Sequence, residues 1–204
     1  MAEDQVLELE NRRRVYEVTQ TYPGLHMRAL QRKLGMSIGL IEYHLNALEK
    51  HGLVTSVSEG GYKRFFPSTT AAGAGSPQDG RERRLLGVLR QRIPLKVALI
   101  LLETSRATLK EISDRLVLSP SLASYHLKKL LAAEIVTNQP VGDSRGYSLF
   151  DANRVAQLLV ANAPPPDLLE EFAEMWEGFA SRQGPQRPPA VPRPPREEDS
   201  KNVQ

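Results

Sequence analysis

The sequence SIGLIEYHLNAL at residues 37–48 returns 82 residues later as SPSLASYHLKKL at residues 119–130. The same offset relates residues 25–56 to residues 107–138, and nine positions are identical in the two copies. In the first copy these positions are Leu34, Ser37, Leu40, Tyr43, His44, Leu45, Leu48, Val54 and Thr55. A constant offset over such a stretch indicates that one structural unit occurs twice in the chain.

The quoted segment predicts a helix in each copy. Ser37 can cap the first turn, because its hydroxyl accepts a hydrogen bond from a backbone N–H group that lacks a partner within the helix. Ile41, Leu45 and Leu48 follow at spacings of four and three, which is the pattern of a buried stripe. A shorter helix at residues 28–34 precedes it, and Gly35 suits a left-handed cap between the two.

A β-hairpin is predicted after each of these helices. The first hairpin spans the β-prone residues 53–57 and 62–66, with turn residues between them. The second spans residues 135–140 and 146–150, and its tip consists of Gly142, Asp143, Ser144 and Arg145. Matching Tyr62 with Tyr147 makes the second hairpin three residues longer than the first.

Further elements flank the repeated units. Residues 4–21 and 81–103 read as helical, and Pro94 is expected either to divide the second of these segments or to start a new helix, because proline suits a first helical turn. Residues 25–27 suit a very short strand. Asp151 can cap a helix that runs through Asn162. A last helix at 167–181 carries an apolar face, a predicted core or dimerisation surface, made of Leu168, Leu169, Phe172, Met175, Trp176 and Phe179.

These elements divide the chain into five parts. They are a first domain at 1–66, an Ala- and Gly-rich linker at 67–80, a second domain at 81–150, C-terminal helices at 151–183, and a Pro-rich tail at 184–204 that is expected to be disordered. The predicted fold class is α+β, mainly α, with two tandem winged helix-turn-helix domains. Each domain has three helices and a β-hairpin wing.

The composition narrows the class of protein. The chain has 204 residues, a net charge of +3 and no cysteine, which removes disulfides and thiolate metal sites. No apolar run is long enough to span a membrane, and the acidic start lacks the pattern of a signal peptide, so a cytoplasmic location is expected. Residues 81–150 hold 12 basic and 6 acidic side chains, against 9 and 8 in residues 1–66. A basic second unit is typical of polyanion binding, although ordinary surface charge also explains it.

The segment Ser37–Val54 resembles the recognition helix and first wing strand of the MarR/ArsR-like superfamily. Tyr43-His44-Leu45 and the residues 48–54 are especially similar to archaeal members, and the second copy keeps Tyr125-His126-Leu127. Residues 11–66 and 81–150 together resemble the tandem winged-helix transcriptional regulators of archaea. The resemblance implies a sequence-specific DNA-binding regulator whose helices 37–51 and 119–133 enter the major groove of double-stranded DNA, with the wings on the backbone.

Residues off the buried stripe are the predicted DNA contacts, because B-DNA presents its full hydrogen-bonding code in the major groove. The first unit supplies Ser37, Gly39, Glu42, Tyr43, Asn46, Lys63 and Arg64. The second unit supplies Ser119, Ser121, Ser124, Tyr125, Lys128, Lys129 and Arg145. Glu42 repels phosphate whereas Lys128 and Lys129 attract it, so the second unit is the stronger candidate for DNA binding.

Several alternatives stay open on sequence alone. The repeated tyrosines and histidines could be packing residues, and Arg12-Arg13-Arg14 could be a solvated helix face. Four histidines suggest a metal sensor only weakly, because they lack metal-ligand spacing, and neither a metal nor another cofactor is expected. No glycine-rich phosphate loop or nucleophile elbow indicates an enzyme. Tandem winged helices also build protein-interaction or architectural modules, so a protein partner for the first domain is the rival hypothesis. The 167–181 helix further suggests a homodimer.

Overall fold

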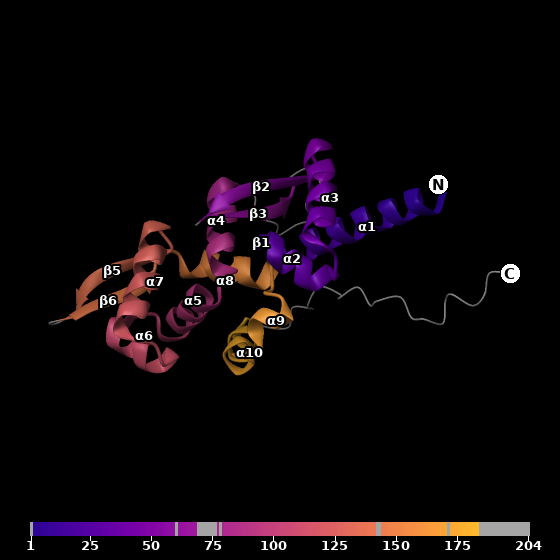
Figure 1. Ribbon diagram of the computed structural model, residues 1–204. Helices are drawn as coiled ribbons and strands as arrows, with labels where there is room; N and C mark the ends of the chain where they lie inside the picture. Colours follow the sequence, from indigo (N-terminus) through magenta and orange to yellow (C-terminus); the bar gives the residue numbers. More distant parts are fainter. Residues whose placement is uncertain are drawn as a thin grey trace.

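The computed structural model describes residues 2–59, 61–68, 77, 79–141, 144–170 and 172–183 (Figure 1). Most of the predicted linker and the whole predicted disordered tail therefore lie outside the described residues. Among the helices that the structure describes, none is both long and apolar enough to cross a membrane.

The first unit has three helices and a three-stranded antiparallel sheet. Its elements are α1 (Ala2–Thr21), β1 (Leu25–His26), α2 (Met27–Leu34), α3 (Ile38–Lys50), β2 (Val54–Glu59) and β3 (Tyr62–Pro67). The strand order is β1-β3-β2, so the short strand before α2 pairs with the second strand of the hairpin.

The second unit repeats this order with one extra helix at its start. Its elements are α4 (Gly80–Leu89), α5 (Arg92–Thr104), β4 (Ala107–Thr108), α6 (Leu109–Leu116), α7 (Pro120–Ala132), β5 (Val136–Val141) and β6 (Ser144–Leu149). The strand order is β4-β6-β5. The helices α8 (Ala152–Ala161), α9 (Pro166–Leu169) and α10 (Ala173–Arg182) follow. The predicted fold class of two tandem winged helix-turn-helix domains is confirmed.

The predicted caps form in both units. The Leu40 N–H group donates to Ser37 Oγ at 3.3 Å, and the Leu122 N–H group donates to Ser119 Oγ at the same distance. Gly35 ends α2 in the left-handed region, as predicted, at a φ of 67°. At the equivalent position of the second unit, Val117 adopts a φ of 52°. A β-branched residue in this region is strained, because its Cβ crowds the following carbonyl group.

The C-terminal ends of α3 and α7 show the same contrast. Gly52 follows α3 at a φ of 67°, and Glu134 takes the equivalent position after α7 at a φ of 55°. At these two helix ends the first unit therefore holds glycine, and the second unit holds residues with a side chain.

Two boundary predictions are wrong, and a third is partly right. The opening segment of the second unit divides at Arg90 and Gln91, which excludes a break at Pro94 itself and agrees with a new helix that starts there. Pro94 lies in the first turn of α5, where a missing N–H group removes no helical hydrogen bond. The helix predicted at 167–181 is divided, because α9 ends at Leu169 and α10 begins at Ala173.

The second wrong boundary is the length of the second hairpin. β5 and β6 are as long as β2 and β3 and keep the offset of 82 residues. The partner of Leu25 is Phe65, and the partner of the equivalent Ala107 is Tyr147. Tyr147 therefore corresponds to Phe65 and not to Tyr62, and the two wings do not differ in strand length.

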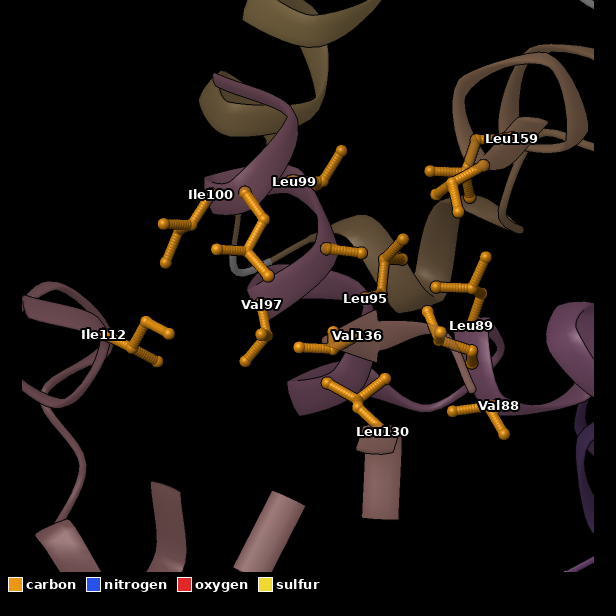
Figure 2. Packing of buried hydrophobic residues seen from close by; sticks show 14 of the residues in the cluster. Val88, Leu89, Leu95, Val97, Leu99, Ile100, Ile112, Leu130, Val136 and Leu159 are labelled. Atoms are coloured by element: carbon orange, nitrogen blue, oxygen red, sulfur yellow. The ribbon is translucent and has the colours of Figure 1, made fainter. Parts of the chain in front are cut away.

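Each unit has its own hydrophobic core. Val15, Leu30, Ile41, Leu45 and Phe65 form the centre of the first. In the second unit α5 passes through the middle, and its side chains are buried on nearly every side (Figure 2). α8 adds Leu159 to this core and α10 adds Phe179, so the C-terminal helices belong to the second unit.

Arg90 connects the two units. Its side chain is buried at the end of α4, where Nε donates to the Pro23 carbonyl oxygen at 2.8 Å and Nη1 donates to the Ala163 carbonyl oxygen at 3.1 Å. Arg64 of the first unit donates to the Gly24 carbonyl oxygen at 2.9 Å. Burial, with a smaller effect of the Arg64 charge, lowers the pKa of Arg90 to about 9. One guanidinium group thus joins the turn after α1 to the segment after α8.

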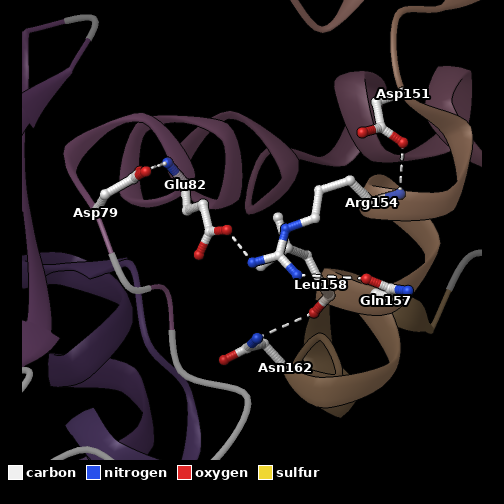
Figure 3. A network of polar contacts seen from close by, with 7 residues as sticks. All are labelled: Asp79, Glu82, Asp151, Arg154, Gln157, Leu158 and Asn162. Atoms are coloured by element: carbon white, nitrogen blue, oxygen red, sulfur yellow. Dashed lines mark hydrogen bonds and ion pairs between the residues drawn. The ribbon is translucent and has the colours of Figure 1, made fainter.

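A polar network ties α8 to the start of α4 (Figure 3). Asp79 caps α4 by accepting from the Glu82 N–H group, and Asp151 caps α8 by accepting from the Arg154 N–H group. The side chains of Arg154 and Glu82 then form an ion pair between the two helices. A second ion pair joins Lys33 Nζ of the first unit to Asp167 Oδ1 of the C-terminal segment at 3.1 Å.

Candidate nucleic-acid interface

The outward face of α3 carries the side chains that the sequence places there. Ile38, Gly39, Glu42, Tyr43 and Asn46 are exposed. The opposite face is buried in the core through Ile41, Leu45 and Leu48. The face available to a partner therefore combines an aliphatic side chain, a carboxylate, a phenol and an amide.

The outward face of α7 has a different composition. Pro120, Ser121, Leu122, Tyr125 and Lys128 are exposed, and Ser124 is half-buried. No acidic residue occurs between residues 120 and 132. This helix therefore presents hydroxyl groups, apolar surface and a positive charge.

The structure separates the repeated tyrosines from the repeated histidines. Tyr43 and Tyr125 are 50% and 60% exposed, so neither has a role in the core. His44 is fully buried and His126 is half-buried beside its tyrosine. Burial, and then the Lys129 charge, lower the pKa of His126. The packing interpretation therefore suits the histidines and not the tyrosines.

Three predicted DNA contacts do not project freely from the molecule. Lys63 Nζ is held by Glu49 Oε2 at 2.8 Å. Arg64 is only 3% exposed, because its guanidinium points inward to the Gly24 carbonyl oxygen. The Lys129 ammonium group donates to Gln91 Oε1 at 2.8 Å, at the start of α5. Arg64 is therefore a wrong prediction for DNA contact, and Lys129 serves the packing of α7 on α5.

In the wing of the second unit, the arginine predicted to contact DNA is exposed. Arg145 is exposed on β6, opposite Pro140 of β5. It occupies the position of Lys63, but Leu131 stands where the first unit has Glu49. Arg145 thus lacks the carboxylate that holds Lys63. The other predicted tip residues, Gly142 and Asp143, lie outside the described residues, and Ser144 is exposed.

Sequence reasoning missed the cations of α2 and α6. Arg28 and Arg32 are exposed one turn apart on α2, and Lys110 is exposed at the position of Arg28 on α6. Asp114 replaces Arg32 in the second unit. The first helix of a helix-turn-helix crosses the DNA backbone, so these residues are candidate phosphate contacts. The sequence did offer a signal for them, because two arginines four residues apart lie on the same face of a helix.

The arginines of α1 are partly engaged within the chain. Arg13 forms an ion pair with Glu17 at 2.8 Å, and Arg14 donates to the Leu34 carbonyl oxygen at 3.3 Å. Arg14 therefore braces α2. Arg13 is exposed one turn before Glu17, so it fits the interpretation that this arginine belongs to a solvated face of the helix.

The apolar face of the C-terminal helices packs within its own chain. Phe172 and Phe179 are buried against the core of the second unit. Leu168, Leu169, Met175 and Trp176 pack on the same core and are half-buried. The two phenylalanines cannot supply an exposed dimer surface, because α5 already covers this face. The homodimer stays a prediction.

The four histidines are spread over the molecule. His26 caps α2 and accepts from the Ala29 N–H group at 3.3 Å, and His51 follows the last turn of α3. Within the described part of the chain, no three His, Asp or Glu side chains gather as a metal site requires.

Two family models match this chain. A model described as an N-terminal HTH domain matches residues 9–73, and a model described as winged helix-turn-helix DNA-binding matches residues 80–137. Each match covers one of the two units. Both descriptions are of the helix-turn-helix type and the second names DNA binding, which supports the prediction that the chain is not an enzyme.

A curated relative is similar to most of the chain. It is the uncharacterized HTH-type transcriptional regulator MJ1398 of Methanocaldococcus jannaschii, 30% identical over 150 residues, which are 74% of this chain and 36% of the relative. The chain thus spans about a third of the length of that relative. The solved structure of reduced HlyU from Vibrio cholerae is 25% identical in sequence to this chain and superposes with a TM-score of 0.34. The match covers 43% of this chain and 82% of the HlyU chain.

The repeat, the two sheets and the two family matches agree on the organisation of the molecule. Each unit has a helix-turn-helix followed by a two-stranded wing, and each is matched by its own helix-turn-helix family. The alignment with the archaeal relative covers 150 residues, which is more than either unit alone contains. The chain therefore contains two winged helix-turn-helix units in tandem.

Proposed function

We propose that this chain binds double-stranded DNA and regulates transcription, with helices 37–51 and 119–133 in the major groove and the wings on the DNA backbone. One observation carries this proposal. Tyr43 and Tyr125 are repeated at the same place on two equivalent helices, and both are exposed. A residue that the scaffold does not need, kept in both copies, suits contact with a partner.

The charges of the second unit support a nucleic-acid partner. Lys110, Lys128 and Arg145 are exposed on α6, α7 and β6, the three elements that a winged helix-turn-helix presents to DNA. Lysine and arginine side chains neutralise phosphates and release the counterions condensed on the duplex. Binding by this unit should therefore weaken steeply as the salt concentration rises.

The first unit offers a different set of contacts. Asn46 can form two hydrogen bonds with adenine, and the Glu42 carboxylate can accept from cytosine. Arg28 and Arg32 on α2 would supply backbone contacts beside those of the wing, where Lys63 is paired with Glu49 and Arg64 is buried. The first unit thus combines base-reading groups on α3 with phosphate-binding groups on α2.

The tandem arrangement supplies two recognition helices within one chain. Two such helices can act as a pseudo-dimer on half-sites about one helical turn, roughly 34 Å, apart. The buried Arg90 contacts support a fixed arrangement of the two units. The predicted cytoplasmic location agrees with a role on DNA. A protein-interaction module is not favoured, because both family matches and the curated relative are of DNA-binding or regulatory type.

The test is a fluorescence-anisotropy titration of the chain onto random duplex DNA at several salt concentrations, beside the double variant Tyr125→Ala/Lys128→Ala. We expect log K to fall linearly with log salt, and the double variant to bind at least tenfold more weakly, since it loses one phosphate contact and one groove contact. Thermal unfolding of the variant checks that it is folded. Absence of wild-type binding at low salt would contradict the proposal and favour the interaction module.

Self-association is tested separately. Trp176→Glu should convert a dimer into a monomer in sedimentation, provided that its unfolding temperature shows an intact fold. Because Trp176 packs on the core of its own chain, Trp176→Phe serves as the control that keeps the packing. A wild-type mass equal to one chain would remove the homodimer.

A further inference from the structure

The outward face of α7 contains unusually large apolar side chains for an exposed helix. Leu122 is 40% exposed and Tyr125 is 60% exposed, and they lie three residues apart, on adjoining positions of the helix. Both lie in the first half of α7, which is the part of a recognition helix that reaches the base edges.

The equivalent face of α3 lacks the exposed leucine, although it exposes Tyr43 and, in its first turn, Ile38 at 41%. Leu40, the counterpart of Leu122, is only half-exposed, and the positions of Ser124 and Lys128 are taken by Glu42 and Asn46. Glutamate and asparagine read bases by hydrogen bonds. In α7 the same positions hold a half-buried serine and a lysine, so the larger part of its central surface is apolar.

Among the groups on base edges in the major groove, the thymine C5 methyl is the one that suits an apolar side chain. We infer that α7 reads thymine methyl groups through Leu122 and Tyr125, and that the half-site of the second unit is therefore rich in thymine. This inference rests on the proposed function. The half-site of the first unit would instead be read by Glu42 and Asn46, so the whole site would be asymmetric.

Charge distinguishes this apolar pair from a surface that docks protein. Lys128 lies one turn after Tyr125, and α7 contains no acidic residue. Lys110 and Arg145 add exposed positive charge on the neighbouring α6 and β6. An apolar strip with positive charge around it matches a thymine-bearing groove between two phosphate backbones.

The experiment begins with selection of binding sequences from a random duplex library by the full chain. The selected duplex is then made in two forms, one with thymine and one with deoxyuridine, which lacks only the methyl group. Affinities of both duplexes are measured for the wild type and for Leu122→Ala, Tyr125→Ala and Asn46→Ala. The Leu122 N–H group that completes the Ser119 cap belongs to the backbone, so Leu122→Ala keeps that bond.

We expect deoxyuridine to weaken wild-type binding about fourfold for each methyl group that is contacted, which corresponds to about 0.8 kcal/mol for a buried carbon group. In Leu122→Ala and Tyr125→Ala the difference between the two duplexes should shrink or vanish. Asn46→Ala, the matched control on α3, should weaken binding to both duplexes and leave their ratio unchanged.

The possible results distinguish failure of the proposed DNA binding from failure of the thymine inference. Failure to enrich any sequence, together with no salt-sensitive binding, would contradict the proposed function itself. Tight, salt-sensitive binding with equal affinity for the two duplexes would overturn only the thymine inference. A palindromic selected site, or a methyl effect that survives both α7 variants, would also overturn it.

Discussion

The two winged units share their interior and differ on their surface. Leu45, Leu48 and Val54 are buried in the first unit, and Leu127, Leu130 and Val136 are buried in the second. The outward positions of α3 and α7 have diverged, from Glu42 and Asn46 to Ser124 and Lys128. The repeated tyrosine is the exception, since it is exposed in both units.

This contrast shows which residues specify the scaffold and which are free to specify a partner. A buried stripe at spacings of three and four fixes the packing of a helix whatever its other face carries. The outward faces can then change without loss of the fold. Two copies of one scaffold can therefore contact two different DNA sequences within one chain.

The largest expected effect tests whether the two interiors are equivalent. Leu45→Ala and Leu127→Ala should each lower the free energy of unfolding by about 2–5 kcal/mol, because both side chains are 1% exposed and leave a cavity. Urea denaturation of the two variants measures this. A loss below about 1 kcal/mol for one of them would mean that the two cores are not equally packed.

The second prediction concerns the joint between the units. Arg90→Met should cost about 3 kcal/mol, because it leaves the Pro23 and Ala163 carbonyl groups without a charged donor. It should also divide one thermal unfolding transition into two, as the units lose their connection. Arg84→Met, at an exposed site on the same helix, is the control. A single unchanged transition would show that the units do not depend on this joint.

The third prediction uses the left-handed positions. Val117→Gly and Glu134→Gly should stabilise the chain by up to about 1 kcal/mol each, since they relieve side-chain crowding at positive φ. The entropy that glycine gains in the unfolded chain offsets part of this gain. Gly35→Val and Gly52→Glu should destabilise it by a similar or larger amount. If all four variants lost stability, the second unit would not be strained.

The smallest expected effect is a difference in how folding stability depends on pH, and it arises from the N-terminal caps of α2 and α6. Burial, and then the charges of Arg64, Arg32 and Arg28, lower the pKa of His26 below its ordinary value of 6.5. The unfolded chain therefore binds more protons as the pH falls, and the stability present above pH 6.5 declines below it. Protonated His26 cannot accept from the Ala29 N–H group.

The equivalent cap of α6 should not respond in this range. Thr108 and Glu111 form a reciprocal capping box, and the hydrogen bonds from Thr108 lower the pKa of Glu111. Its contribution is complete above the unfolded value of about 4.5 and is lost only as the pH falls further. Between pH 7.5 and 5.5, the wild type should therefore lose more stability than His26→Asn, which keeps a cap that does not titrate. Equal losses in denaturation would contradict this.

The interior of the molecule was predictable from the sequence, and most side-chain partners were not. Ser37, Ser119 and Gly35 have their predicted capping roles, because caps depend on residues adjacent in the chain. The burial of Arg64 and the contact of Lys129 with Gln91 depend on elements that meet only in the folded chain. Charge alone could not separate these cations from Lys128.

The wing alignment shows a second limit of sequence reasoning. Alignment of the two wings by their tyrosines made Tyr147 the equivalent of Tyr62. The backbone pairing shows that its equivalent in the first unit is Phe65. In a strand, the register determines which face a side chain occupies, and the register follows the pairing partner rather than residue identity. The same argument equates Arg145 with Lys63.

Chemical footprinting on the selected duplex is the most direct test of whether both units contact DNA. We expect two protected segments for the wild type, and these segments should differ in sequence. Tyr43→Ala/Asn46→Ala should lose protection of one segment, and Tyr125→Ala/Lys128→Ala should lose the other. A single protected segment that neither variant alters would contradict the central claim that two equivalent scaffolds present two different recognition faces to DNA.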